Sequence, residues 1–423
     1  IVLDELYKII YKHTKDEMTD FERKFRIIQY SLYGVDVMPW AIHAAELRLW
    51  LQLIIETELK DQELKKAPLL PNLDLNLRIG DSIVQEIGGV NINIRTGRFP
   101  SKIKKRLEDL KEQKRLYYEN SRSVRLKKSE DFQKEEIRIF EDMIDHEIKE
   151  LKRKLKFKTR DSKSKQLTLK GDVKEEGYKL TKKEIREIKD EIKRLVRIKE
   201  VLYDPEKKPF IWEIDFAEIF GAKGGFDIVI GNPPYLSYKK ISPPTILKKN
   251  VTNEKQKEYK NKLKLAISDK FDKLGIQVSI HGFSDYYVYF YFYTLTLLNQ
   301  DGVHSFVTSN FWLDTDYGVH LQKFLCKNVP IIGVFDCFNR TFKAKINTVI
   351  TFLRSPVNSL NSLHSPIKSE YDDGLNNTVK FVLLKDSFEK SINASNLIEI
   401  ENMDTKDLDL IEKKEYRVFI IKQ

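Results

Sequence analysis

The alternation of hydrophobic and polar positions changes its period several times along the chain, and each period predicts a type of element. In the first 30 residues, apolar side chains such as Leu3, Leu6 and Ile10 recur at helical spacing, which predicts a helix over residues 3–30. Strands that alternate with helices then predict an α/β fold built on a doubly wound sheet. The predicted strands cover 31–37, 75–81, 226–230, 303–308, 331–335, 347–353 and 379–384, and the predicted helices run from Pro39 to Leu51 and over 284–299.

A charged segment interrupts this pattern between about residues 101 and 205. Lys, Glu, Arg and Asp dominate 102–158 and 182–203, and the sparse apolar positions there keep a helical period. We therefore predict a long, charged, antiparallel helical hairpin inserted into the α/β domain. A solvated spacer is the alternative interpretation. The chain then divides into four parts: 1–100, the insertion 101–205, 206–356, and the start of a C-terminal region at 357–423.

The composition narrows the class of protein. Hydrophobic residues make up 41% and aromatic residues 11% of the 423 residues, which is typical of a globular chain. Charged residues reach 33%, and the formal net charge is +11. This basic surplus fits a polyanionic partner such as nucleic acid, and a solvated, lysine-rich surface explains it equally well.

Cysteine usage and hydropathy bear on the compartment. The two cysteines, Cys326 and Cys337, form neither a disulfide framework nor a zinc-binding spacing, which favours a reducing cytoplasm. No run of about 18 apolar residues lacks charge, so we expect no membrane span. The chain starts at Ile1 within a helical pattern and without a signal-type segment, so we expect it to be part of a longer protein.

The residues with the clearest chemistry are Asn232, Pro233, Pro234 and Tyr235, directly after an apolar strand. Open parallel sheets bind ligands at the carboxyl ends of their strands. An exocyclic amine of adenine is a poor nucleophile, because its lone pair is delocalised into the ring. The Asn232 amide oxygen and the Pro233 carbonyl, held still by two prolines, would favour tetrahedral geometry and expose that lone pair. Tyr235 offers a flat face to an extruded base; a rigid strand-exit turn is the alternative.

This strand and its Asn-Pro-Pro-Tyr motif resemble the catalytic motif of DNA amino-methyltransferases. The wider pattern is similar to the large branch of N6-adenine DNA methyltransferases found in fused restriction–modification enzymes. The resemblance covers roughly residues 1–100 and 205–355. It implies a Rossmann-like class I methyltransferase sheet, S-adenosylmethionine as cofactor, and double-stranded DNA with a flipped adenine as substrate. Methyl transfer from a sulfonium to a neutral amine needs no metal, so we expect none in the site.

Two further motifs match the family's cofactor site. The first contains Asp36, Val37 and Met38: an acid at the tip of a strand accepts hydrogen bonds from ribose hydroxyls in Rossmann-like folds, and Asp36 fits that role. The resemblance places Val37 and Met38 against the cofactor adenine. It also implies that Asp81, which Ser82 follows, accepts from the adenine amino group. The alternative for Asp36 is a cap on the next helix.

Residues later in the chain match the family's substrate side. The resemblance places an aromatic residue of the 338–349 loop against the extruded adenine, and Phe342 has the matching position; a core phenylalanine is the alternative. The stretches 285–287 and 309–313 are similar to later motifs of the family and line the site by position. Lys239 and Lys240 are placed to meet phosphates or to keep the surface soluble. Contact of the insertion with the DNA backbone is a further alternative, which the mixture of acids and bases along the insertion disfavours.

The resemblance also concerns segments that lie outside this sequence. The family's glycine-bearing cofactor loop would precede Ile1, and a target-recognition domain would follow Gln423. We therefore expect the isolated chain to bind S-adenosylmethionine poorly and to be inactive alone. A restriction or specificity module is expected on the same chain or on a partner chain, with any nuclease upstream. Two other functions stay open: methylation of another amine, in RNA or protein, and a catalytically silent DNA-binding subunit.

Overall fold

The computed structural model describes residues 2–14, 17–55, 73, 75–87, 90–91, 100–118, 121–160, 181–202, 210–272, 274–337, 347–356, 377–386, 388–403 and 410–423. These residues fall into two compact units, of which the first ends at Glu218 and the second begins at Ile219. Both contain helices and strands, so the predicted α/β class is confirmed. No helix in the described ranges is both long enough and apolar enough to cross a membrane. The domain limits that we drew from composition remain a proposal.

The first unit contains the described helices that precede residue 216 and two small pairs of strands. Its elements are α1 (Val2–Thr14), α2 (Asp20–Ser31), β1 (Gly34–Asp36), α3 (Pro39–Ile55), β2 (Leu77–Ile79), β3 (Glu86–Ile87), β4 (Val90–Asn91), α4 (Ser101–Tyr118), α5 (Ser129–Arg160), α6 (Lys182–Val201) and α7 (Trp212–Asp215). Helix α8 (Ala217–Lys223) follows at the limit between the units.

The single helix predicted over 3–30 is wrong, because the structure has two helices there. Thr19 is the N-cap of α2, and its hydroxyl accepts a hydrogen bond from the Glu22 backbone N–H. The Glu22 carboxylate in turn accepts from the Thr19 backbone N–H at 2.8 Å. This reciprocal capping box starts a new helix. The two helices then pack together through an apolar core that includes Leu3, Ile27 and Ile28.

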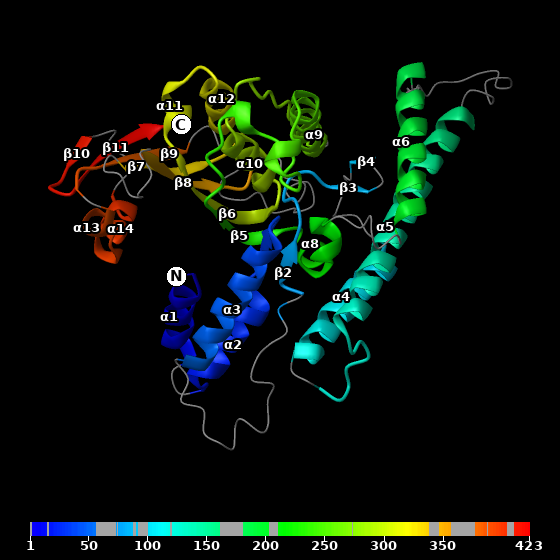
Figure 1. Ribbon diagram of the computed structural model, residues 1–423, viewed down its shortest axis with the longest axis horizontal. Coiled ribbons are helices and arrows are strands. Elements are labelled where there is room, and N and C mark those ends of the chain that lie inside the picture. Colours follow the sequence, from blue (N-terminus) through cyan, green and yellow to red (C-terminus); the bar gives the residue numbers. More distant parts are fainter. Residues whose placement is uncertain are drawn as a thin grey trace, which may run out of the picture. The chain divides into compact units, whose positions relative to one another are not determined.

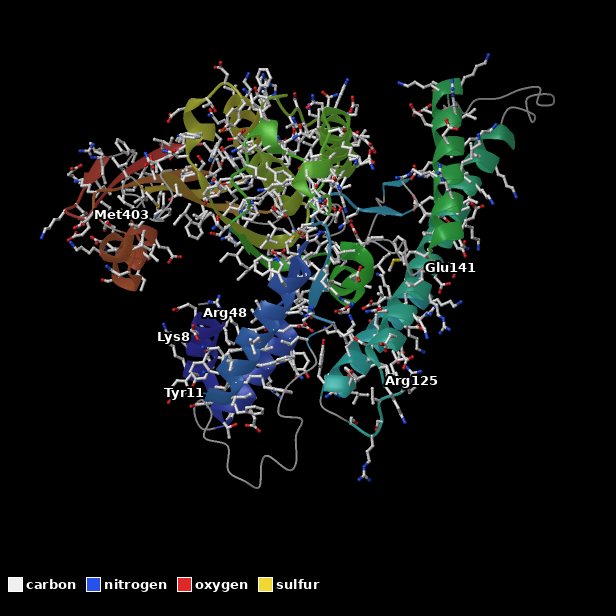
Figure 2. The ribbon with its side chains drawn as sticks, viewed as in Figure 1. Lys8, Tyr11, Arg48, Arg125, Glu141 and Met403 are labelled. Atoms are coloured by element: carbon white, nitrogen blue, oxygen red, sulfur yellow. The ribbon has the colours of Figure 1, made fainter. Side chains whose placement is uncertain are left out.

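The inserted segment contains three helices, one more than a hairpin needs. Helices α5 and α6 lie side by side and form the predicted antiparallel pair (Figure 1). Lys199 of α6 pairs with Asp145 of α5 at 2.7 Å and with Glu141 at 3.2 Å, and Figure 2 shows Glu141 at this place. The additional helix, α4, packs along α5, where Arg106 pairs with Glu135 at 2.6 Å.

The inserted helices belong to the core of the first unit. Their apolar side chains pack around α5, where Ile139, Phe140 and Ile144 are fully buried. The same cluster includes Leu75 before β2 and Ile211 before α7. Because these helices share one core with residues on both sides of the insertion, their described parts are not a solvated spacer. The role of the insertion as an arm on DNA stays a prediction.

A group of buried charges connects β2 to the insertion. Arg78 of β2 donates to the Glu136 carboxylate of α5 at 3.0 Å, and both side chains are almost wholly buried. Lys114 of α4 lies 3.0 Å from the same carboxylate and 2.7 Å from Glu218. Asp215 lies 3.9 Å from Arg78. Burial raises the pKa of Glu136, and the two cations oppose that shift.

The second unit is built on a larger sheet. Its elements are β5 (Phe226–Gly231), η1 (Tyr238–Lys240), η2 (Lys248–Asn250), α9 (Asn253–Asp272), α10 (Tyr286–Leu295), β6 (Leu298–Ser309), α11 (Phe311–Asp314), α12 (Gly318–Asn328), β7 (Ile331–Cys337), β8 (Thr348–Arg354), β9 (Thr378–Leu384), α13 (Phe388–Ser391), α14 (Ala394–Glu401), β10 (Leu410–Glu412) and β11 (Tyr416–Lys422).

Seven described strands form this sheet in the order β10-β11-β9-β7-β8-β6-β5. Strand β5 pairs parallel with β6, and β8 pairs antiparallel with both β6 and β7. The carboxyl ends of β5, β6 and β7 therefore lie at one edge of the sheet. Helices α9 to α12 lie on one side of the sheet and α13 and α14 on the other (Figure 1).

The apolar composition of β5 predicts a strand covered on both faces, and this prediction is wrong for the described residues. Strand β5 is the last strand of the described sheet, paired with β6 alone. Ile228 and Ile230 are 62% and 61% exposed. An apolar run predicts a strand, but the burial of the two faces of that strand depends on which other segments pack against it.

A buried histidine lies in the core between α10 and the sheet. His304 of β6 is fully buried, and its Nε2 lies 2.9 Å from the Thr294 hydroxyl oxygen. That hydroxyl donates to the Phe290 carbonyl at 2.6 Å, so the Nε2–H of His304 is the donor to it. The Nδ1 atom is buried without a hydrogen-bond partner in the described part of the chain. Burial lowers the pKa of His304 to about 3.

We expect this histidine to make the second unit sensitive to acid. Below the unfolded-state pKa of about 6.5, the unfolded chain binds a proton that the native state excludes. Stability is therefore lost as pH falls from about 6.5 toward 3, by about 2 kcal/mol at pH 5. The test measures the urea concentration at which β6, within the whole protein, loses its protection from hydrogen exchange, at pH 7.5 and at pH 5. His304→Leu should lose less stability than the wild type; an equal loss in both would contradict the assignment.

Candidate active site

The Asn-Pro-Pro-Tyr loop begins where β5 ends, at the edge that also holds the ends of β6 and β7. The chain can leave β5 at this point because residue 231 is a glycine: a Cβ there would lie 2.9 Å from the ring of Phe306. Phe306 is buried against Tyr291 and His304 and cannot move away easily. A glycine is therefore required at the last position of β5, and the loop starts from a rigid base.

Two hydrogen-bond acceptors, the Asn232 amide oxygen and the Pro233 carbonyl, belong to consecutive residues at the start of this loop. Asn232 is exposed and Pro233 is buried. Among the described residues, none donates a hydrogen bond to the Asn232 amide oxygen or to the Pro233 carbonyl. Residues that precede proline avoid the helical region, and proline itself has a fixed φ, so the backbone of both residues has limited freedom. This arrangement can accept two N–H groups of one planar amine.

Tyr235 is attached to the neighbouring strand through its hydroxyl. The hydroxyl donates to the Val307 carbonyl of β6 at 3.0 Å. The ring is half-buried and meets the Tyr287 ring edge to face, with centroids 6.3 Å apart. Burial raises the pKa of Tyr235 to about 12, so the hydroxyl stays protonated and remains a donor at neutral pH. The ring orientation is therefore set by tertiary contacts and not by the loop alone.

A chain of hydrogen bonds that we did not predict from the sequence lies behind Tyr235. The hydroxyls of Tyr287 and Tyr317 are 2.9 Å apart, and Tyr317 donates to the Asp285 carboxylate at 3.0 Å. The other Asp285 oxygen accepts from the Tyr238 backbone N–H at 3.2 Å. Burial raises the pKa of Asp285, and these two donors oppose the shift. The sequence prediction had placed Asp285 and Tyr287 at the site; Tyr317 has no local motif that could reveal it.

The residues matched to the cofactor site lie in the first unit. Strands β1 and β2 are parallel, and the Gly80 backbone N–H donates to the Asp36 carbonyl at 3.0 Å, so Asp36 and Asp81 lie at neighbouring strand ends. One Asp36 carboxylate oxygen accepts from the Met38 backbone N–H at 2.7 Å. This bond closes a turn before α3, which begins at Pro39, so it does not cap the helix in the way that the alternative predicts. The second oxygen of Asp36 has no hydrogen bond within the described residues.

Asp81 and the residues around it are held by turn contacts. One carboxylate oxygen of Asp81 accepts from the backbone N–H groups of Ile83 and Val84, at 2.9 and 3.0 Å. The Ser82 carbonyl accepts from the Trp212 indole at 3.0 Å. A Cβ at Gly80 would lie 2.0 Å from Cβ of Phe210, so glycine is required before Asp81.

An apolar surface lies beside these acids. Met38 is 40% exposed and Ile79 is 48% exposed, and Val37 is partly exposed. Acceptor oxygens next to apolar side chains fit a nucleoside, which presents hydroxyls and a flat ring. Phe342, predicted to face the substrate base, lies outside the described residues.

The comparison with protein families decides the relationship. The model of the Eco57I restriction-modification methylase family matches residues 30–342, about three quarters of the chain. The chain belongs to this family. The matched part of this Eco57I-family chain contains both cofactor motifs and the Asn-Pro-Pro-Tyr loop, and it ends at Phe342.

A curated relative supports the same relationship. A protein of Methanocaldococcus jannaschii, named as a type II restriction enzyme and methyltransferase, is 28% identical over 284 residues. The match covers 59% of this chain and 22% of the relative. The Eco57I-family chain therefore spans about a fifth of the length of the curated protein it matches.

Solved structures show weaker similarity. The type ISP restriction-modification enzyme LlaBIII, bound to DNA, is 11% identical, with a TM-score of 0.40 over 95% of this chain and 18% of that one. A Listeria monocytogenes protein described as a class I S-adenosylmethionine-dependent methyltransferase is 12% identical, with a TM-score of 0.28 over 95% of this chain and 96% of that one.

Metal ligands do not gather in the described parts of this Eco57I-family chain. No group of three or more His, Cys, Asp or Glu side chains there is arranged to hold a metal ion. Cys326 is exposed and Cys337 is buried, and neither forms a disulfide.

Proposed function

We propose that this chain is the catalytic part of a site-specific DNA methyltransferase that methylates the N6 amine of adenine in a restriction–modification or phage-defence system. Family membership supports methyl transfer. The observation that carries the finer proposal is the pair of unoccupied acceptors, the Asn232 amide oxygen and the Pro233 carbonyl. Two acceptors one residue apart, held by prolines, match the two N–H bonds of one exocyclic amine.

The chain's own residues would prepare the amine for attack. With one N–H directed to Asn232 and the other to Pro233, the nitrogen lone pair leaves conjugation with the ring and points at the incoming methyl carbon. Tyr235 would stack on the base of a nucleotide that has left the duplex, and its hydroxyl bond to Val307 would keep the ring still. Phe342 is proposed for the other face of the base.

The cofactor supported by the family is S-adenosylmethionine, which when bound supplies an electrophilic methyl group on a sulfonium sulfur. The second oxygen of Asp36 would accept from ribose hydroxyls. Val37 and Met38 would contact the adenine ring, with Asp81 and Ser82 at its amino group. The exposed Met38 and the available Asp36 oxygen support this assignment.

Nucleoside mass spectrometry tests the proposal. DNA from cells that express the full-length gene, of which this chain is a part, should contain N6-methyladenine, and DNA from a parallel culture with Asn232→Ala should not. If neither DNA contains the modified base, the proposal is wrong, and RNA and protein from the same cells would then be searched for methylated amines. If the full-length protein binds DNA and does not bind the cofactor, it is a catalytically silent DNA-binding subunit.

A further inference from the structure

Two aromatic rings and two lysines form a surface just beyond the catalytic loop. The Tyr238 surface consists of Tyr238 and Lys239 of η1, Lys260 of α9, and Phe283. The rings of Tyr238 and Phe283 lie 4.8 Å apart, and Phe283 is 58% exposed. The ammonium groups of Lys239 and Lys260 lie 5.7 and 5.6 Å from the centre of the Tyr238 ring. Cations and exposed rings are therefore interleaved within one small area.

The charge around this surface is not neutralised locally. Lysines occur on η1, on η2 and along α9, and eight of them form no ion pair with a carboxylate in the described part of the chain. Burial and the neighbouring Lys264 lower the pKa of Lys260, as expected for a cation without a counterion. Helix α9 carries six lysines and four acids, so its acids do not cancel its basic charge, and one of them, Glu258, pairs with Lys262. The eight are Lys239, Lys240, Lys248, Lys249, Lys255, Lys257, Lys260 and Lys264.

The Tyr238 surface is held in a fixed position relative to the Asn-Pro-Pro-Tyr loop. The Leu236 carbonyl accepts from the Tyr286 backbone N–H at 2.8 Å, and Tyr238 donates to Asp285. The Gln256 side chain of α9 donates to the Lys239 carbonyl at 3.1 Å. Tyr238 is three positions after Tyr235, so their Cα atoms are at most about 11 Å apart. A polymer engaged at the catalytic loop would pass over this surface.

We propose that the Tyr238 surface binds the DNA strand next to the target adenine. Lys239 and Lys260 contact phosphates, and Phe283 stacks on a neighbouring base. Phosphates and planar bases recur together along a nucleic acid strand, and this matches lysines interleaved with rings better than an acidic peptide does. The inference rests on DNA being the substrate, as proposed above. It adds a binding surface that the Asn-Pro-Pro-Tyr motif does not contain.

Salt-dependent binding tests the lysines directly. The dissociation constant of a fluorescent DNA duplex is measured between 50 and 200 mM salt, for the wild-type protein and for Lys239→Ala/Lys260→Ala. Each lost phosphate contact should lower the slope of log affinity against log salt by about 0.9, so the double variant should lose about 1.8. The control, Lys327→Ala/Lys414→Ala, removes two exposed lysines, one in the last turn of α12 and one in the turn between β10 and β11. Equal slopes in all three proteins would overturn the proposal.

Phe283→Ala tests the stacking contact separately. It should weaken DNA binding about tenfold without changing the salt slope, because no phosphate contact is removed. If Phe283→Ala binds DNA as tightly as the wild type does, Phe283 does not stack on a base. If the variant loses binding to RNA and keeps its binding to DNA, the assignment of DNA to this surface is wrong. These binding results are independent of methylation. If the wild-type protein makes N6-methyladenine and the lysine variant keeps the wild-type salt slope, the proposed role of the Tyr238 surface is wrong and the proposed function stands. If the wild-type protein makes no N6-methyladenine, the proposed function is wrong.

Discussion

Asn232→Ala is expected to lower the rate of methyl transfer by about 10²–10³-fold, the loss typical when one preorganised electrostatic contact is removed from an active site. Asn232 is exposed, and no described residue bonds to its amide oxygen, so the substitution leaves no buried group unpaired. The loss should therefore appear in kcat and not in stability. Single-turnover incorporation of labelled methyl groups into DNA, with saturating cofactor, measures it.

Tyr235→Phe is the matched control for this prediction. It keeps the aromatic face and removes only the hydroxyl bond to the Val307 carbonyl. A neutral hydrogen bond contributes about 0.5–1.5 kcal/mol, so the rate should fall by no more than about tenfold. If Asn232→Ala lowers the rate of methyl transfer no more than Tyr235→Phe does, the Asn232 amide does not orient the reacting amine, and its proposed role is wrong.

Glu136→Ala is expected to lower the stability of the first unit by about 3–5 kcal/mol, because it leaves buried cations without their shared carboxylate. Glu136 is fully buried, and Arg78 and Lys114 each lie 3.0 Å from it. Lys114 keeps Glu218 as a partner, whereas Arg78 keeps only the more distant Asp215 side chain and its carbonyl. The measurement is the urea concentration at which peptides of α5 lose hydrogen-exchange protection.

Glu135→Ala on the same helix is the control. Glu135 is 22% exposed and pairs with Arg106, which also pairs with Asp142. Removing a partly exposed partner usually costs under about 1 kcal/mol. Equal urea midpoints for the two variants would contradict the view that the buried charges hold the insertion to β2. Restoration of the midpoint by Glu136→Gln would show that hydrogen bonding, rather than charge, is what Arg78 needs.

Local patterns predicted the elements that carry the chemistry. The apolar run before Asn232 is strand β5, and the Asn-Pro-Pro-Tyr loop begins where that strand ends. Asp36 is the last residue of β1, and Asp81 follows β2 by two positions. These predictions succeeded because strand period, proline geometry and turn residues act over a few neighbouring residues. The roles of these side chains toward cofactor and base remain proposals.

Other predictions failed where a short pattern had more than one solution. The continuous helical period over 3–30 did not reveal the break at Thr19, although the Thr19–Glu22 capping box is visible in the sequence. The charged insertion was expected to contain two helices, and α4 adds a third that packs along α5. The sparse apolar positions of the insertion have helical spacing whether it forms two helices or three, so the period alone could not give the number of helices.

The sequence by itself determined the α/β class, the Asn-Pro-Pro-Tyr loop and its place at a strand end, because these depend on contiguous residues. The tertiary structure alone decided what holds them. Tyr235 is anchored by a carbonyl 72 residues away, and Arg78 is paired with a carboxylate 58 residues away. Tyr317 reaches Asp285 across 32 residues. Such contacts depend on how whole elements pack, and no period or motif in one segment specifies its distant partner.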